Sequence, residues 1–342
     1  MAFGTGGNLA AYVAYPWSIL KEAPHFSYML HFKKGNVMKI LMQVALVVLF
    51  SSASLYSEQT LSPSMASAIE ILNEYEVFAN VVYSVGSGFD SKLDAYVRKN
   101  VPTAVPVVVV IHGGGWVAGD KEGRILEGLP YLEMGFDVVN VEYRLARIAP
   151  APAAVQDCRL ALQWIFANAA RYNFDTSKVV VTGGSAGGHL ALMTGLLRAS
   201  DGFDAPNGWN QNPPATRVAA IINWFGIADV ADLLDGPNRQ QYAVSWIGMQ
   251  PEPQKVAASV SPLTYVRQES PPVLTVHGDK DELVPYQHAV RLHKALDAAR
   301  VPNQLISIPG GRHGGFSPKD YVSCYEQIVK FLAARGIKSL RP

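Results

Sequence analysis

A serine stands inside a glycine-rich turn, Gly183-Gly184-Ser185-Ala186-Gly187. The turn follows the β-branched run Lys178–Thr182 and precedes the helical stretch His189–Leu197. A serine on such a sharp strand-to-helix turn needs small residues two positions before and after it, because larger side chains there would collide. The turn also places the hydroxyl at a helix N-terminus, where free N–H groups and the helix dipole favour negative charge. Ser185 is therefore a candidate nucleophile.

A second glycine run, His112-Gly113-Gly114-Gly115-Trp116, follows an apolar stretch. Three consecutive glycines let bare backbone N–H groups approach a ligand oxygen, and in acyl transfer such donors stabilise the oxyanion of the tetrahedral intermediate. We predict that Gly114 and Gly115 donate from this loop and that the N–H of Ala186 is the third donor. His112 is interpreted as a residue that orients the loop.

Two aspartates, Asp279 and Asp281, follow the apolar run Pro272–His277. An aspartate on the loop after a buried strand can reach a histidine and hold its tautomer. Asp281 fits an Asp-x-x-Val-Pro pattern and is the predicted orienting carboxylate, with Asp279 as the alternative. Either residue could instead form an Asx turn or cap the helix expected near Gln287.

His313 lies between two pairs of glycines in the segment 310–315, after the apolar run Gln304–Ile308. The flanking glycines leave space for a substrate beside the imidazole, so His313 is the predicted general base. Other histidines lie near the N-terminus or in predicted helices: His25, His31, His189, His288 and His293.

The chain order of these candidates is Ser185, Asp281, His313. Each follows a predicted strand, and ligand sites of open α/β sheets lie at the carboxyl ends of the strands. The order Ser…Asp…His is also the order that an α/β-hydrolase site requires. The motifs are weak singly, but together they indicate an acyl-transfer site of the esterase kind.

The elements that must position these residues alternate between strands and helices from about Pro63 onward. The predicted strands are Ala79–Tyr83, Lys92–Val97, Val107–Ile111, Asp137–Glu142, Lys178–Thr182, Ala219–Trp224, Pro272–His277 and Gln304–Ile308. The first two carry polar residues and predict an antiparallel edge, whereas the later Val/Ile runs predict parallel strands buried on both faces. Helical spacing marks Ala153–Ala169, Gln287–Arg300 and Lys319–Ala334. This alternation predicts an α/β fold with a mostly parallel eight-stranded sheet and helices on both faces.

The segment at about 228–262 is longer than a plain crossover helix and carries aromatic residues among polar ones. We predict a small lid there, over the carboxyl ends of the strands; the alternative is a crossover helix with a solvent loop. Trp116 and Trp246 are the predicted substrate-binding residues. Trp224 is a third candidate for a pocket wall, with core packing as its alternative.

The composition limits the classes of protein that the chain can belong to. It has 342 residues, of which 49% are hydrophobic and 17% charged, and this excludes intrinsic disorder. Its net charge of +1 provides no basic field for a nucleic acid. With only Cys158 and Cys324, no disulfide framework or cysteine-rich metal site defines the fold, and the two thiols are either buried and free or paired. We expect no cofactor.

The segment 38–53 has the features of a secretory signal. Lysines precede the apolar run Ile40–Phe50, and small residues follow it. The run is too short for a spanning helix, which needs about 20 apolar residues. We expect cleavage near Ala53, with an uncleaved anchoring segment as the alternative.

Signal peptides begin near their basic end, so Met38 is the expected initiator and residues 1–37 are expected to lie upstream of it. Residues 1–53 then form a leader that the mature protein lacks. We expect an exported protein, periplasmic or extracellular, without stable membrane insertion. Its catalytic domain is predicted at 63–338.

The chain resembles the α/β-hydrolase family, and within it the HGGG-bearing esterase and lipase group related to hormone-sensitive lipase. It looks most like the bacterial feruloyl- and acetyl-esterase-like branch. Besides the four motifs, the likeness rests on Gly119-Asp120-Lys121, Glu142–Ala146 and Pro152–Asp157, and it spans roughly residues 70 to 335. The resemblance implies a Ser-His-Asp triad, an oxyanion hole and no metal. One departure is Gly184, which stands where aspartate is common in the lipase-like branch.

The predicted function is that of a serine carboxylesterase acting on short-chain acyl or aryl esters, of acetyl or feruloyl type, through an acyl-enzyme. A small-molecule ester is the expected partner. Amide-cleaving hydrolases, such as an arylformamidase or an exopeptidase, use the same triad and are the alternative. An inactive binding protein on the same fold is a further reading, although such proteins usually lack the serine, the histidine or the glycines that are present here.

Overall fold

Eight mostly apolar segments pair into one sheet in the computed structural model, which describes residues 62–204 and 214–341. The strands are β1 (Tyr75–Gly86), β2 (Phe89–Arg98), β3 (Val105–Ile111), β4 (Asp137–Val141), β5 (Phe174–Gly184), β6 (Ala220–Trp224), β7 (Val273–Gly278) and β8 (Asn303–Ile308). Their order across the sheet is β1-β2-β4-β3-β5-β6-β7-β8. The β1–β2 and β2–β4 pairs are antiparallel and all other neighbours are parallel. The predicted fold class is confirmed, including the antiparallel edge.

The chain from Ser62 onward forms one compact unit. The predicted leader and signal segment lie outside the described residues.

Helices precede, connect and follow these strands. They are α2 (Pro63–Glu74), α3 (Leu129–Glu133), α4 (Ala153–Ala167), α5 (Ala169–Tyr172), α6 (Ala186–Leu196), α7 (Gln241–Ile247), α8 (Pro253–Ser259), α9 (Gln287–Ala298) and α10 (Pro318–Ala333). A capping box begins α10: the Ser317 hydroxyl accepts from the Asp320 N–H, and the Asp320 carboxylate accepts from the Ser317 N–H. In the described part of the chain, no helix is long and apolar enough to cross a membrane.

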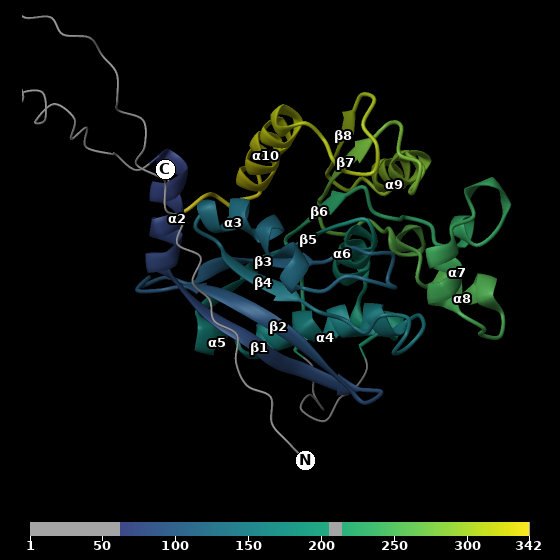
Figure 1. Ribbon diagram of the computed structural model, residues 1–342, viewed down its shortest axis with the longest axis horizontal. Coiled ribbons are helices and arrows are strands. Elements are labelled where there is room, and N and C mark those ends of the chain that lie inside the picture. The colour runs from purple at the N-terminus through teal and green to yellow at the C-terminus, as the bar shows by residue number, and fades with distance from the viewer. Residues whose placement is uncertain (1–61, 205–213, 342) are drawn as a thin grey trace, which may run out of the picture. The chain divides into compact units, whose positions relative to one another are not determined.

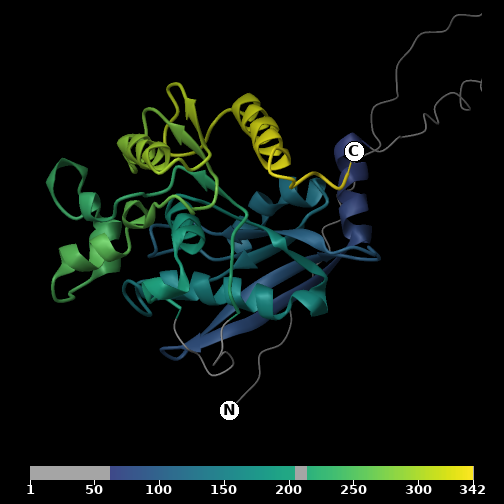
Figure 2. The same cartoon turned by 180° about the vertical axis from the view of Figure 1, so that it is seen from behind.

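The central strands of the sheet are buried on both faces. Along β3, Val107 and Val109 pack on the face covered by α4, α6 and α9, while Val108 and Val110 pack on the face covered by α3 and α10. Figures 1 and 2 show α3 and α10 on one side of the sheet and α4 on the other. This two-sided burial explains why the central strands are continuous Val/Ile runs.

The two cysteines lie on opposite faces of the sheet. Cys158 in α4 belongs to one core cluster and Cys324 in α10 to the other. Both are buried and free, so the pairing that the sequence left open does not occur.

The parallel strands bring the predicted motifs to one edge of the sheet. The HGGG loop follows β3, Ser185 follows β5, Asp281 follows β7 and His313 follows β8. Because β3 and β5 are neighbours in the sheet, the glycine loop and Ser185 start from adjacent strand ends. The carboxyl edge of this sheet is therefore where a site must be sought.

Candidate active site

Ser185 sits between β5 and α6 in a strained backbone conformation, with φ 57° and ψ −121°. A Cβ atom at Gly183 would lie 2.4 Å from the Ile111 carbonyl oxygen, and one at Gly187 would lie 2.1 Å from the same oxygen. Side chains are therefore excluded at both positions, as the spacing of the motif predicts. A strained residue held in this way is typical of a functional site.

Ser185, His313 and Asp281 form one hydrogen-bonded chain. The Nδ1 atom of His313 lies 2.7 Å from Oδ2 of Asp281, and its Nε2 lies 2.8 Å from Oγ of Ser185. Because an ionised carboxylate only accepts, Nδ1 carries the hydrogen and Nε2 is free to accept from the serine. The alternative carboxylate, Asp279, instead accepts from the Gly310 N–H at 2.7 Å.

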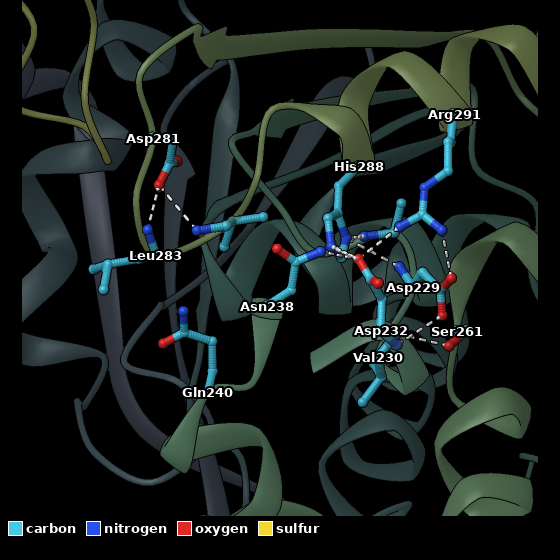
Figure 3. A network of polar contacts seen from close by, with 12 residues as sticks. Asp229, Val230, Asp232, Asn238, Gln240, Ser261, Asp281, Leu283, His288 and Arg291 are labelled. Carbon is cyan, nitrogen blue, oxygen red and sulfur yellow. Dashed lines mark hydrogen bonds and ion pairs between the residues drawn. The ribbon is translucent and has the colours of Figure 1, made fainter. Parts of the chain in front are cut away.

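The Asp281 side chain is fully buried and receives four donors. Its Oδ1 accepts from the N–H group of Leu283, as Figure 3 shows, and from that of Val284, both at 2.9 Å. Its Oδ2 accepts from His313 and lies 3.2 Å from Nε2 of His277. Burial alone would raise the pKa of Asp281, but the hydrogen bonds from His277, His313 and Val284 outweigh it and hold the pKa well below its ordinary value. Asp281 thus stays ionised.

The glycine loop adopts a conformation that requires its glycines. Gly114 and Gly115 have φ values of 115° and 59°. A Cβ atom on Gly114 would lie 2.1 Å from the Ala118 carbonyl oxygen, and one on Gly115 would lie 2.8 Å from Cβ of Tyr242. The third predicted donor, Ala186, is the first residue of α6, where a backbone N–H has no partner within the helix.

His112 orients this loop through contacts of its side chain, as the sequence suggests. Its buried ring stacks on Tyr143 at 4.2 Å, and its Nδ1 donates to the Gly113 carbonyl at 2.8 Å. The Tyr143 hydroxyl donates to the His112 carbonyl at 3.0 Å. Burial lowers the pKa of His112, so this residue is a neutral structural element.

A cavity of about 420 Å³ opens over Ser185 and His313. It is lined by Gly113, Gly114, Gly115, Arg124, Glu127, Gly184, Ser185, Phe225, Tyr242, Leu283, His313, Gly314, Gly315 and Tyr321. Phe225 is not among the predicted site residues, although it directly follows β6 and therefore lies at a strand end, where ligand sites of such sheets are found. Arg124 and Glu127 come from a 3-10 segment, Glu122–Gly128, that carries no sequence signal.

The two tryptophans predicted to bind substrate do not line this cavity. Trp116 and Trp246 are fully buried and stack on each other with ring centroids 4.1 Å apart. The Trp116 indole donates to Nδ1 of His189 at 3.1 Å, and Nε2 of His189 donates to the Val260 carbonyl at 2.7 Å. The residue of this cluster that does reach the cavity is Tyr242. Both tryptophans are buried in the core because two large apolar rings stabilise the protein more there than in the wall of an open cavity.

The predicted lid segment, 228–262, contains α7, α8 and short 3-10 turns. Its Tyr242 lines the cavity, and the Tyr242 hydroxyl donates to the Leu283 carbonyl at 2.9 Å. The segment therefore contributes a wall of the site. Movement of this wall as a lid stays a prediction.

A polar network joins the start of this segment to α9 (Figure 3). His288 and Arg291 of α9 point toward Asp229 and Asp232, and Oδ2 of Asp232 accepts from both, at 3.1 and 3.0 Å. Arg291 also donates to Asp229 at 2.8 Å. The other ring nitrogen of His288 accepts from the N–H groups of Ala228 and Asp229 at 3.2 and 3.3 Å. This nitrogen must stay unprotonated to accept these two hydrogen bonds.

Lowering the pH should reduce the free energy of unfolding, because the protein contains buried histidines that resist protonation when folded. Burial lowers the pKa values of His288 and His189 to about 4, whereas unfolded histidine titrates near 6.5. The unfolded chain therefore takes up protons first, so the stabilisation is complete above about pH 6.5 and is lost as pH falls toward 4. A difference of this size corresponds to about 3 kcal/mol for each histidine.

Urea unfolding of the wild type and of His288→Asn at several pH values tests this prediction. The asparagine oxygen can accept in place of Nδ1 but does not titrate. Comparison with a variant is needed because burial raises the pKa of Asp137 to about 8, and that carboxyl titrates in the opposite sense. We expect the wild type to lose about 3 kcal/mol more than the variant between pH 6.5 and 4. Parallel pH curves would contradict the assignment.

Among the residues that the structure describes, no group of three or more His, Cys, Asp or Glu side chains could hold a metal ion.

Several known proteins are similar to this chain in sequence. The chain is 28% identical over 239 residues to the probable carboxylic ester hydrolase LipM of Mycobacterium tuberculosis, covering 67% of this chain and 53% of that protein. It is 31% identical over 173 residues to the hormone-sensitive lipase of Bos taurus, covering 45% and 22% of the two chains. The chain thus spans about half the length of LipM.

A solved structure titled as a truncated carbohydrate esterase from gut microbiota superposes with a TM-score of 0.68 at 27% identity, covering 78% of this chain and 98% of that one. These matches confirm the resemblance that the motifs suggest. The sequence model of the BD-FAE family matches residues 93–296, which is more than half of the chain. With its eight-stranded sheet and its Ser-Asp-His order, the chain belongs to the BD-FAE family, on the α/β-hydrolase fold.

Proposed function

We propose that this protein is a serine carboxylesterase that hydrolyses short-chain acyl or aryl esters through an acyl-enzyme. The observation that carries the proposal is the hydrogen-bonded chain Ser185–His313–Asp281, whose serine and histidine line a cavity together with the glycine loop 113–115. The names of the relatives, a carboxylic ester hydrolase and a carbohydrate esterase, support ester chemistry.

In the first half-reaction Ser185 Oγ attacks the ester carbonyl carbon while its proton passes to Nε2 of His313. The carbonyl π electrons move onto oxygen, and the N–H groups of Gly114, Gly115 and Ala186 stabilise the resulting oxyanion. The intermediate collapses when the carbon–oxygen bond to the alcohol breaks. The alcohol oxygen takes the proton from Nε2, which leaves an acyl group on Ser185.

In the second half-reaction a water molecule replaces the alcohol. His313 takes a proton from the water as its oxygen attacks the acyl carbon, and the same donors receive the second oxyanion. Collapse breaks the bond to Oγ, and Nε2 returns the proton to Ser185. Asp281 stabilises the imidazolium in both halves because its ionised carboxylate accepts from Nδ1.

Hydrolysis of p-nitrophenyl acetate, butyrate and palmitate by the protein from Ser54 onward tests the proposal. We expect measurable rates on acetate and butyrate and covalent labelling of Ser185 by a fluorophosphonate. An N-formyl arylamine assayed in parallel separates ester from amide cleavage. A folded protein that neither labels nor hydrolyses any of these esters would refute the carboxylesterase assignment.

His277 should act as a positioning residue for Asp281. Its buried Nε2 lies 2.9 Å from the Val284 carbonyl, which only accepts, so this nitrogen carries the hydrogen that also faces Asp281. Losing one donor to a buried carboxylate should lower kcat about tenfold in His277→Phe with KM unchanged. His277→Gln, which keeps a donor, should restore most of kcat. Equal kcat values in the phenylalanine variant and the wild type would show that His277 only packs.

We also propose that the protein is exported, on the strength of the basic and apolar segments before Ala53. N-terminal sequencing of the natural protein tests this directly. A mature N-terminus near Ser54 is the expected result, and a protein that begins at Met1 or Met38 would contradict it.

A further inference from the structure

A second, smaller cavity of about 80 Å³ lies beside the main one. Its lining is largely aromatic and consists of Val110, Glu127, Tyr131, Thr182, Gly183, Gly184, Trp224, Phe225, Tyr321 and Tyr325. Four of these residues also line the main cavity: Glu127, Gly184, Phe225 and Tyr321. The two cavities therefore share one wall directly beside the proposed nucleophile.

Phe225 belongs to this wall and has a constrained backbone. Its backbone has φ 40°, a left-handed value that is rare for a bulky residue. The neighbouring hydrogen bonds enforce it: the Phe225 N–H donates to the Val276 carbonyl at 2.7 Å, and the Gly226 N–H donates to Oδ1 of Asn223 at 3.0 Å. The ring then meets the His313 imidazole edge-on with centroids 4.8 Å apart. Such strain beside a reacting group favours a functional role over simple packing.

Two glycines make room for this ring. A Cβ atom at Gly184 would lie 3.3 Å from Cζ of Phe225, and one at Gly314 would lie 3.1 Å from the same atom. An aspartate at 184, common in the lipase-like branch, would therefore press on the ring. Glycine at position 184 thus leaves the space that the Phe225 ring occupies.

The inner cavity has a small capacity. A water molecule occupies about 30 Å³, so the space holds on the order of three water-sized groups. An apolar cavity that binds benzene measures about 150 Å³, so an aromatic ring does not fit without movement of the wall. The contact from the Tyr131 hydroxyl to the Thr182 hydroxyl at 3.4 Å is uncharged. The carboxylate of the lining, from Glu127, belongs to the wall shared with the main cavity and already accepts from Arg124 at 3.1 Å. The space suits a short, uncharged group.

We propose that this inner cavity binds the smaller half of the ester and that Phe225 sets its size limit. An acetyl or propionyl group, or an equally small alcohol, would enter it, while the larger half of the ester occupies the open cavity. This inference rests on the proposed esterase function and narrows the substrate class to esters with one half of about three non-hydrogen atoms.

The test compares the wild type with Phe225→Ala on two homologous series. One series varies the acid from acetate to hexanoate with p-nitrophenol fixed, and the other varies the alcohol from methyl to hexyl with acetate fixed. Removing the ring joins the two cavities, so kcat/KM for the longer members, relative to the shortest, should rise at least tenfold in one series. The series that responds identifies which half occupies the inner cavity.

Phe78→Ala is the matched control, because Phe78 is also a phenylalanine but lies on β1 against Tyr172 and lines neither cavity. It should leave the length preference unchanged. Phe225→Leu is a milder second variant that guards against misfolding, and fluorophosphonate titration counts active sites in each preparation. If the Phe225 variants are labelled by the fluorophosphonate but keep the wild-type length preference in both series, the proposal for the inner cavity is wrong and the esterase proposal stands. A wild type that neither labels nor hydrolyses esters would overturn the esterase proposal, and the inference with it.

Discussion

Replacing Ser185 by alanine should lower kcat on p-nitrophenyl acetate by about a million-fold, and adding His313→Ala should lower it no further. The two side chains act as one unit, because His313 has no proton to take once the hydroxyl at 2.8 Å from its Nε2 is gone. Substrate binding uses the cavity walls, so KM should change little. Steady-state rates of both single variants and the double variant give the comparison.

Fluorophosphonate labelling provides the control for these variants. Labelling should disappear with Ser185→Ala and persist slowly with His313→Ala, since the hydroxyl is then present without its base. Independent, multiplicative losses in the double variant would mean that the two residues do not share one step. That result would count against the proposed mechanism even if each single variant were slow.

Replacing Asp281 by asparagine should lower kcat by about 10⁴. The carboxylate accepts from four donors, whereas an amide has one accepting oxygen and an NH₂ group that must face donors already in place. If the amide nitrogen faces His313, Nδ1 becomes the acceptor and Nε2 carries the hydrogen. The imidazole then holds the wrong tautomer to accept the proton of Ser185.

Asp279→Asn is the matched control for this experiment. Asp279 lies two residues away and accepts from the Gly310 N–H, not from His313, so its variant should keep kcat within a few-fold of the wild type. Kinetics of both variants, with thermal unfolding to confirm the fold, decide between the two carboxylates. A larger loss in Asp279→Asn than in Asp281→Asn would reverse their assignment.

Much of the fold could be predicted from the sequence because its signals are local. The run Val107–Ile111 must be buried on both faces, and the structure places it in the middle of the sheet with core on either side. All eight predicted strands are present, with ends that differ by a few residues. The largest differences at a strand start are in β1 and β5, which begin four residues before the predicted Ala79 and Lys178, because pairing with β2 and β3 continues past those residues.

The residues of the candidate site could also be predicted from the sequence. The glycine motifs are local in the chain, and Ser185, Asp281 and His313 each follow a strand that the sequence predicts. Tertiary structure decided which aromatic residues surround the site. Trp116 and Trp246 look like pocket walls in sequence, yet they stack on each other and are fully buried, while Tyr242 and Phe225 reach the cavity. The physical reason is that burial of a large ring depends on segments far apart in the chain, and no local pattern encodes which ring finds a partner.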